Sequence, residues 1–313
     1  MDERTQHALH AFWLSCGLAD AAWPAARDAF VRFHDLIAAA NDAAGLMGPN
    51  WDDGFYFKHV ADSLAALRAF QGTKGPRGHG TISAGVAASP GPCSLVPSPW
   101  SPVPFRLADV GCGAGFPGFI LAIALPGLRL TAIESNHKKA QFVASAAREL
   151  GLGERVEVVA RRARELGHDP AYAGRFDIVT ARAVASADRL IRECRLLLNQ
   201  GTRDPEDGTR DQGPGTREET SNRTRRAGAG PVCLSPSPCS LVPSLSSSAP
   251  GPLVPWSLVP SLVLYKTPDA VAAEMPPARR EAAKHGLVVD VSDVIALPGS
   301  AGLRQFLRVR HSP

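Results

Sequence analysis

Apolar runs of strand length alternate with helical segments along much of the chain. Five of these runs lie at 106–110, 128–134, 155–160, 176–181 and 262–266. The segments 117–124 and 138–150, which follow the first two runs, have helical character, and the tail adds two further apolar runs, at 286–294 and 304–310. This alternation predicts an α/β fold with a doubly wound, mostly parallel sheet and helices on both faces. In such sheets the ligand binds outside the carboxyl ends of the strands.

Two helical patterns precede the first strand. Pro24 can begin a helix whose apolar face repeats at Phe30, Phe33 and Ile37. A second apolar face of helical spacing is formed by Phe57, Ala61, Leu64 and Leu67. Residues 1–71 are therefore expected to form N-terminal helices within the same domain as the sheet.

Residues 72–104 and 201–261 are rich in Gly, Pro and Ser and have no sustained helical or strand period, which predicts two disordered insertions. They share the hexapeptide CSLVPS, and residues 208–214 read GTRDQGP, the translation of a DNA heptamer GGGACCA through its three frames. We interpret both as translated copies of one DNA repeat; a proline-rich arm that binds a partner is the alternative. Residues 105–200 and 262–313 then form the core, with strands one to four in the first part.

Composition narrows the class of protein only modestly. The net charge of +4 is too small to identify a nucleic-acid-binding protein by itself. The absence of a transmembrane-length apolar run and of a signal peptide makes a cytoplasmic protein without a membrane partner the expectation. The six cysteines show neither a CxxC pair nor zinc-ligand spacing, so we expect no metal site and no catalytic thiol.

The stretch DVGCGAGFPG, residues 109–118, places four glycines directly after the first strand. Read from Gly113 it matches GxGxxG, which is typical of nicotinamide dinucleotide sites. Read from Gly111 it matches GxGxG, the form that holds S-adenosylmethionine. Gly111 follows the strand at once, and Pro117 fits a first helical turn better than a helix interior. The second register, with Gly111, Gly113 and Gly115 at the cofactor, is therefore favoured.

Two acidic residues accompany this loop. Glu134 ends the second strand, where a carboxylate can accept hydrogen bonds from a ribose diol or, alternatively, cap the next helix. Asp109 is expected either to organise the loop or to meet the amino group of the cofactor.

Several motifs occur in a fixed order: KHVADSL, VGCGAGFPG, IESNHKK, RRARE, TARAVAS, LVLYK and LRQFLRV. Together they resemble the bacterial RsmG/GidB family, the 16S rRNA guanine-N7 methyltransferases, over nearly all of the chain outside the two insertions. The resemblance implies a class I S-adenosylmethionine-dependent methyltransferase (Rossmann-like) fold with a seven-stranded sheet. It also implies methyl transfer to N7 of a guanine, at the 527-type position of the 530 loop. The implied partner is 16S rRNA or the small ribosomal subunit.

The resemblance also implies roles for single residues. Cofactor contacts carry over to Gly111, Phe116, Ala163, Arg164 and Arg182. The candidate catalytic residues are His59, Lys138, Arg162, Lys266 and Arg304. The four basic ones match family positions that face the cofactor or the RNA, and the alternative for each is a solvated surface charge. Guanine N7 carries a lone pair and loses no proton on methylation, so His59 is expected to orient the substrate or brace the site rather than act as a strong base.

The chain departs from the family pattern at Gly45–Met47, at Ala181 and at Thr267. These departures leave the cofactor better supported than the rRNA target. A methyltransferase for another RNA, a protein or a small molecule therefore stays open, as do a nicotinamide oxidoreductase and a binding protein with little activity.

Overall fold

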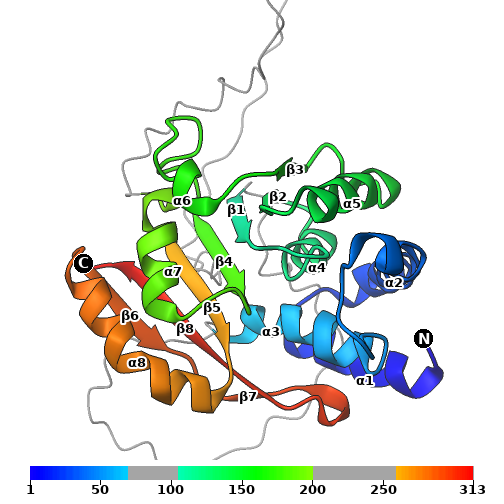
Figure 1. Ribbon diagram of the computed structural model, residues 1–313. Coiled ribbons are helices and arrows are strands. Elements are labelled where there is room, and N and C mark those ends of the chain that lie inside the picture. Colours follow the sequence, from blue (N-terminus) through cyan, green and yellow to red (C-terminus); the bar gives the residue numbers. More distant parts are fainter. Residues whose placement is uncertain (70–104, 200–258, 313) are drawn as a thin grey trace, which may run out of the picture. The chain divides into compact units, whose positions relative to one another are not determined.

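The computed structural model describes residues 1–69, 105–199 and 259–312, which belong to one compact unit of the chain (Figure 1). The two expected insertions lie outside the described residues, apart from the end of the second. There, Ser261 is already the first residue of a strand and is buried. That strand therefore begins one residue before the predicted boundary.

The predicted sheet is confirmed. Its strands run in the order β3-β2-β1-β4-β5-β8-β6, and a short additional strand, β7, pairs with β8. Neighbouring strands from β3 to β5 are parallel, whereas β8 is antiparallel to both β5 and β6. The bounds are β1 Phe105–Val110, β2 Leu128–Ile133, β3 Val156–Val159, β4 Ile178–Arg182, β5 Ser261–Lys266, β6 Leu287–Val291, β7 Ile295–Ala296 and β8 Leu303–His311.

Successive residues of each strand enter two different hydrophobic cores, because side chains alternate between the faces of a sheet. Leu107 of β1 and Val263 of β5 lie in one core, which also contains the N-terminal helices. Ala108 and Leu264 lie in the other. Helices α7 and α8 cover this second face, while α2, α3 and α4 lie on the first (Figure 1). Both faces are therefore buried, as the continuous apolar runs indicate.

The helices of the sheet region begin close to their expected positions. The two that the sequence predicts are α4, Gly118–Ala124, and α5, His137–Glu149. The others are α6 Ala163–Leu166, α7 Ala187–Cys194 and α8 Pro268–Ala283, with single 3-10 turns at Asp20–Ala22, Arg195–Leu197 and Pro298–Ser300.

The N-terminal helical extension is also confirmed. It consists of α1 Glu3–Ser15, α2 Trp23–Ala44, a wide π-type turn η2 Tyr56–Ala61, and α3 Asp62–Ala69. The predicted face of α2 is fully buried. Phe57 is only partly buried, whereas Ala61, Leu64 and Leu67 are fully buried. Gly45 ends α2 in the left-handed region, with φ of 57°, a conformation that favours glycine.

Candidate functional site

The candidate site lies where β1, β2 and β4 end, at the carboxyl edge of the parallel sheet. The glycine loop follows β1, Glu134 follows β2, and Arg182 is the last residue of β4. Because these three strands are neighbours in the sheet, the three features come together at one edge. This is the edge at which open α/β sheets bind their ligands.

The glycine loop adopts a conformation that requires glycine. Gly111, Gly113 and Gly115 have φ values of 69°, 58° and 109°. A Cβ at Gly111 would lie 2.6 Å from a methyl group of Val184, whereas a Cβ at Gly113 would meet nothing within 4 Å. The loop is thus closely covered at Gly111 and open at Gly113. Its helix begins only at Gly118, as the GxGxG register predicts.

Asp109 ties the end of the loop to the sheet. Its carboxylate is fully buried and accepts hydrogen bonds from Gly118 N at 2.8 Å and from Thr180 Oγ1 at 3.1 Å. Burial raises the pKa of Asp109 to about 7, although both hydrogen bonds favour the charged form. Of the two roles expected for Asp109, these contacts support the organisation of the loop.

Glu134 joins the loop to the next helix. Its Oε2 accepts from Gly113 N at 3.0 Å, and its Oε1 accepts from Asn136 N at 2.8 Å. The cap of α5 is instead the side chain of Asn136, which accepts from Lys138 N and Lys139 N. The carboxylate therefore lies at the open position of the loop, where a diol could reach it, and that contact stays a prediction.

A cluster of charged side chains lies beside the loop on the α3 face of the sheet. Arg182 Nη1 donates to Asp62 Oδ2 at 2.9 Å, and Arg182 Nη2 lies 3.1 Å from His59 Nδ1. Arg304 of β8 donates to the other oxygen of Asp62. Side chains alternate between the two faces of a strand, so Arg182 lies on the same face as Ile178, and Arg304 lies on the same face as Phe306. Ile178 and Phe306 both belong to the first core, which places the two arginines on the same side of the sheet.

Phe116 connects this cluster to the glycine loop. The guanidinium carbon of Arg182 lies 5.2 Å from the centre of the Phe116 ring, within cation–π range. The His59 ring lies 5.1 Å from the same ring at an angle of 31°. The loop, the arginine and the histidine therefore form one packed unit.

His59 is neutral near pH 7. Burial lowers its pKa to about 4, and the nearby charges of Arg182, Lys58 and Arg304 act in the same direction. The imidazole ring of His59 therefore carries no positive charge at physiological pH.

Other predicted residues are not part of this cluster. Lys266 lies on the opposite face of β5, where its Nζ bonds to Glu274 and to the Ala185 carbonyl at 2.9 to 3.1 Å. Lys138, Arg162 and Arg164 are exposed beyond the ends of β2 and β3, and none of the three forms an ion pair with a residue in the described parts of the chain. Ala163 is buried at the start of α6.

Two residues complete the site without having been assigned to it from the sequence. Asp62 is the shared partner of both arginines, and only its position three residues after His59 signalled it. Val184 lies over Gly111 and is 43% exposed, and the preceding Ala183 has a left-handed φ of 55°. No pattern in the sequence indicates that contact.

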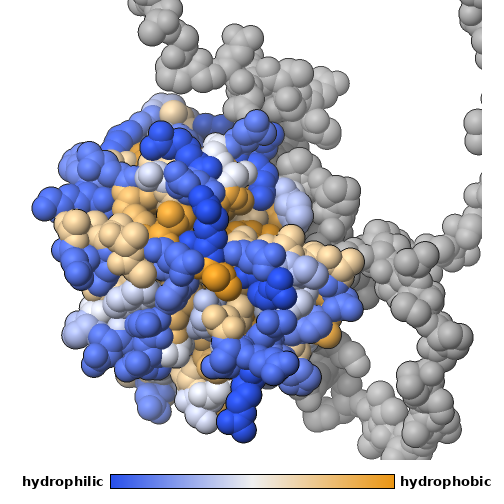
Figure 2. Space-filling view, turned by 90° about the vertical axis from the view of Figure 1, so that its right-hand side faces the viewer, coloured by the Kyte–Doolittle hydropathy of each residue, from blue (hydrophilic) through white to orange (hydrophobic). Residues whose placement is uncertain are grey.

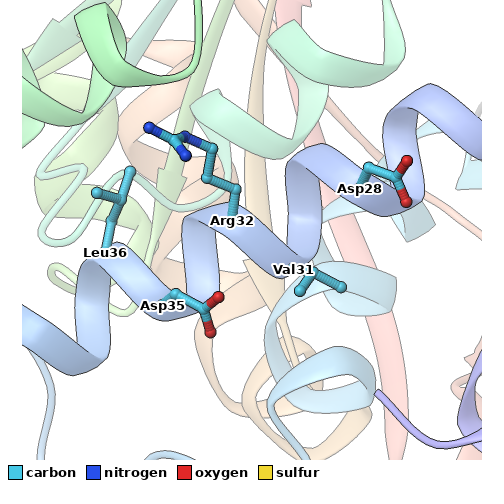
Figure 3. Close-up of a pocket in the computed structure, with 5 residues that line it drawn as sticks. All are labelled: Asp28, Val31, Arg32, Asp35 and Leu36. Carbon is cyan, nitrogen blue, oxygen red and sulfur yellow. The ribbon is translucent and has the colours of Figure 1, made fainter.

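A separate groove lies on α2, with a volume of about 430 Å³. It is lined by Asp28, Val31, Arg32, Asp35 and Leu36 (Figure 3). Seen from the side of the N-terminal helices, the surface mixes apolar patches with hydrophilic residues (Figure 2). None of the groove's lining residues belongs to the glycine loop or the arginine cluster, so this groove is distinct from the candidate site.

Two further observations concern the described residues alone. Their helices are all too short or too polar to cross a membrane. Their His, Cys, Asp and Glu side chains form no group of three that could hold a metal ion.

Comparisons with known proteins give a consistent result. Residues 94–203 match the family model described as rRNA small subunit methyltransferase G. A ribosomal RNA small subunit methyltransferase G from Synechococcus sp. (strain WH7803) is 51% identical over 84 residues, 27% of this chain and 33% of the relative. The protein of the same name from Synechococcus sp. (strain JA-2-3B'a(2-13)) is 32% identical over 198 residues, 62% of this chain and 66% of the relative.

Solved structures resemble the chain more distantly. A precorrin-6y C5,15-methyltransferase from Geobacter metallireducens GS-15 is 14% identical, with a TM-score of 0.36, and the match covers 68% of this chain and 85% of that one. The first curated relatives are matched over only about a third of their own length. The family model, the longer sequence matches and the expected sheet agree: the chain belongs to the rRNA small subunit methyltransferase G (GidB) family and has the class I methyltransferase fold.

Proposed function

We propose that this chain transfers the methyl group of S-adenosylmethionine to N7 of a guanine in 16S rRNA. The observation that carries the proposal is the open position at Gly113, bordered by the Glu134 carboxylate, in a loop whose Phe116 ring lies 5.2 Å from the Arg182 guanidinium carbon. The relatives' name, ribosomal RNA small subunit methyltransferase G, supports the RNA substrate.

The residues present fit the cofactor. The absence of a side chain at Gly113, where nothing covers the loop, allows close approach to the backbone, and the Glu134 carboxylate suits a ribose diol. Gly115, Phe116, Ala163, Arg164 and Arg182 complete the proposed contacts. When bound, S-adenosylmethionine supplies a methyl group activated by a sulfonium centre.

The side chains of the cluster suit the chemistry of N7. The guanine N7 lone pair lies in the plane of the base and is free without loss of a proton, so no strong base is needed. In the cluster, Asp62 is already bound to two arginines and His59 is neutral. These residues can therefore orient the base and manage charge, which is the contribution that the reaction requires.

The exposed basic residues suit an RNA partner. N7 in paired A-form RNA lies in a deep, narrow groove, so the target guanine must be unpaired or splayed. Lys138 and Arg162 lie exposed on the strand-end side of the molecule and can contact phosphates. Such contacts would weaken as salt rises. Because small ribosomal subunits are cytoplasmic, we propose the same compartment for this chain.

The test is methyl transfer from labelled S-adenosylmethionine to isolated small ribosomal subunits, followed by nucleoside analysis of the 16S rRNA. Labelled 7-methylguanosine is the expected product. Parallel reactions with naked 16S rRNA, transfer RNA and total protein distinguish the other substrate classes. Label that appears only in another RNA or in protein would contradict the proposed substrate, and the absence of label throughout would contradict the enzyme activity.

A further inference from the structure

The contact between His59 and Arg182 fixes the tautomer of the histidine. Arg182 Nη2 lies 3.1 Å from His59 Nδ1, and a guanidinium carries only donors. His59 Nδ1 must therefore be the acceptor, which places the ring proton on Nε2. Burial and the neighbouring cations keep the ring neutral, so Nε2 retains the only ring N–H.

That remaining N–H has no partner among the described residues. The hydrogen-bond and ion-pair contacts of the His59 side chain involve Nδ1 alone. Among the described residues, the fully buried side-chain nitrogens without a partner are Arg195 Nε and His311 Nε2. The Nε2 atom of His59 has no partner in the described chain and is not one of them, so it is not fully buried. Nε2 is therefore accessible, on a ring held in place by Phe116 and Phe55 at centroid distances of 5.1 and 5.8 Å.

We propose that His59 is a specificity residue that identifies the target base as guanine, because its Nε2–H donates a hydrogen bond to guanine O6. This inference rests on the proposed function. Guanine presents the O6 acceptor beside N7, whereas adenine presents an amino donor at the corresponding position. An N–H held at this point attracts guanine and opposes adenine, although both bases carry an N7 lone pair.

The cations of the site are less suited to this task. Two of the five N–H groups of Arg182 bond to Asp62 and His59, and the three that remain carry a positive charge; Lys266 is bound to Glu274 on the other face. Arg304 has donors left beyond its bond to Asp62, but its charge would withdraw electron density from the base whose N7 must attack. A neutral donor reads O6 and leaves N7 more nucleophilic. Arg182 then acts as a positioning residue for His59.

Two substitutions separate the two nitrogens of His59. In His59→Asn the amide oxygen can replace Nδ1 as the acceptor for Arg182, while the donor at the Nε2 position is lost. In His59→Gln the amide nitrogen can reach the Nε2 position and keep the donor. His285→Asn, in the turn after α8 and away from the site, is the matched control, because among the described residues the His285 side chain bonds to Glu281 alone.

The experiment measures kcat/KM for methyl transfer to small subunits reconstituted with RNA that carries guanine, inosine or 2-aminopurine at the methylated position. Inosine keeps O6, and 2-aminopurine lacks it. For the unaltered protein and for His285→Asn we expect inosine to react nearly as guanine does, and 2-aminopurine to react about tenfold to hundredfold more slowly. Calorimetric binding of S-adenosylmethionine checks that each variant retains its cofactor site.

His59→Asn should lose a similar factor on guanine and then distinguish guanine from 2-aminopurine by less than about threefold, whereas His59→Gln should keep most of the discrimination. If His59→Asn still distinguishes guanine from 2-aminopurine as strongly as the unaltered protein does, the proposed role of His59 is overturned while the proposed function stands. If the unaltered protein does not methylate guanine N7 at all, the proposed function fails, and this inference with it.

Discussion

Asp62 of α3 and Arg182 of β4 form an ion pair of 2.9 Å in which the carboxylate is only 1% exposed. The same carboxylate also binds Arg304 of β8, so one buried negative charge holds two arginines that lie far away in sequence. Removal of one member of a buried pair leaves the other charge unpaired, which is far more costly than removal of both.

Asp62→Ala should therefore lower the free energy of unfolding by about 3 kcal/mol. Urea unfolding of Asp62→Ala, Arg182→Ala and the double variant measures the coupling, and the double variant should lose less than the sum of the single losses. Glu193→Ala, which breaks an exposed pair with Arg189, is the control and should cost less than about 1 kcal/mol. Additive losses at Asp62 and Arg182 would mean that the pair is not coupled.

The contact of Val184 with Gly111 predicts unequal effects of alanine within one loop. Gly111→Ala and Gly113→Ala both place a side chain in the left-handed region, at a cost of about 1 to 2 kcal/mol. Only in Gly111→Ala does the new methyl group also meet Val184. The free energy of unfolding of Gly111→Ala should therefore be lower than that of Gly113→Ala by about 1 kcal/mol. Val184→Ala in the Gly111→Ala background should recover most of that difference in urea unfolding. Equal losses at the two glycines would show that Val184 does not cover Gly111.

The buried Asp109 predicts a pH dependence of stability. Burial raises its pKa from 3.8 in the unfolded chain to about 7 in the folded state, so between these values the folded state binds more protons than the unfolded state. Stability from this residue is then present at low pH and is lost as pH rises to about 7, by up to about 1.4 kcal/mol per pH unit. His59, whose pKa falls from 6.5 to about 4, contributes the opposite slope between those two values.

Asp109→Asn keeps the shape of the side chain and removes its titration. The stability of this variant relative to the unaltered protein should therefore rise between pH 5 and 7 and change little above about pH 7.5. Urea unfolding without cofactor at half-unit pH intervals measures this difference, with Asp290→Asn, at a half-exposed carboxylate paired with Arg310, as the control. Parallel curves across this range would rule out a raised pKa for Asp109.

The predicted insertions provide a deletion test. Asn199 N donates to Phe176 O, and Ser261 N donates to Asp177 O. Because Phe176 and Asp177 are consecutive residues, the two ends of the chain that flank the second insertion lie close together. Val259 O accepts from Ser261 and Arg308, which sets the end of the deletion at residue 258. Deletion of 202–258, and separately of 73–103, should leave the calorimetric affinity for S-adenosylmethionine within about twofold. A tenfold loss, about 1.4 kcal/mol, would show that the deleted segment contributes to the site.

The sequence predicts the sheet and the glycine loop well because both depend on local pattern. The strands are continuous apolar runs, and Pro117 marks the start of α4. Other helices were less visible. Helix α8 continues through Pro276 and Pro277, which normally argue against a helix interior, and the sequence pattern predicts none of α1, α6, α7 and α8. Tertiary packing decides these segments, because α7 and α8 pack against the sheet and α1 packs against η2 and α2.

Side-chain partnerships were the part that the sequence could not provide. Lys266 and Arg304 look alike as basic residues near the site, yet strand parity directs one to Glu274 and the other to Asp62. Asp62 itself is separated from its partners by 120 and 242 positions. Such pairings depend on which face each strand residue occupies in the folded sheet.

The glycine loop is held entirely by the protein's own bonds. Gly111 N and Cys112 N donate to the Ile133 carbonyl, Gly113 N donates to Glu134, and Gly118 N donates to Asp109. The entropy of ordering these residues is therefore spent during folding rather than during ligand binding. A ligand that arrives at Gly113 meets a preorganised surface, and its association rate should be governed by diffusion and charge rather than by a slow rearrangement of the loop.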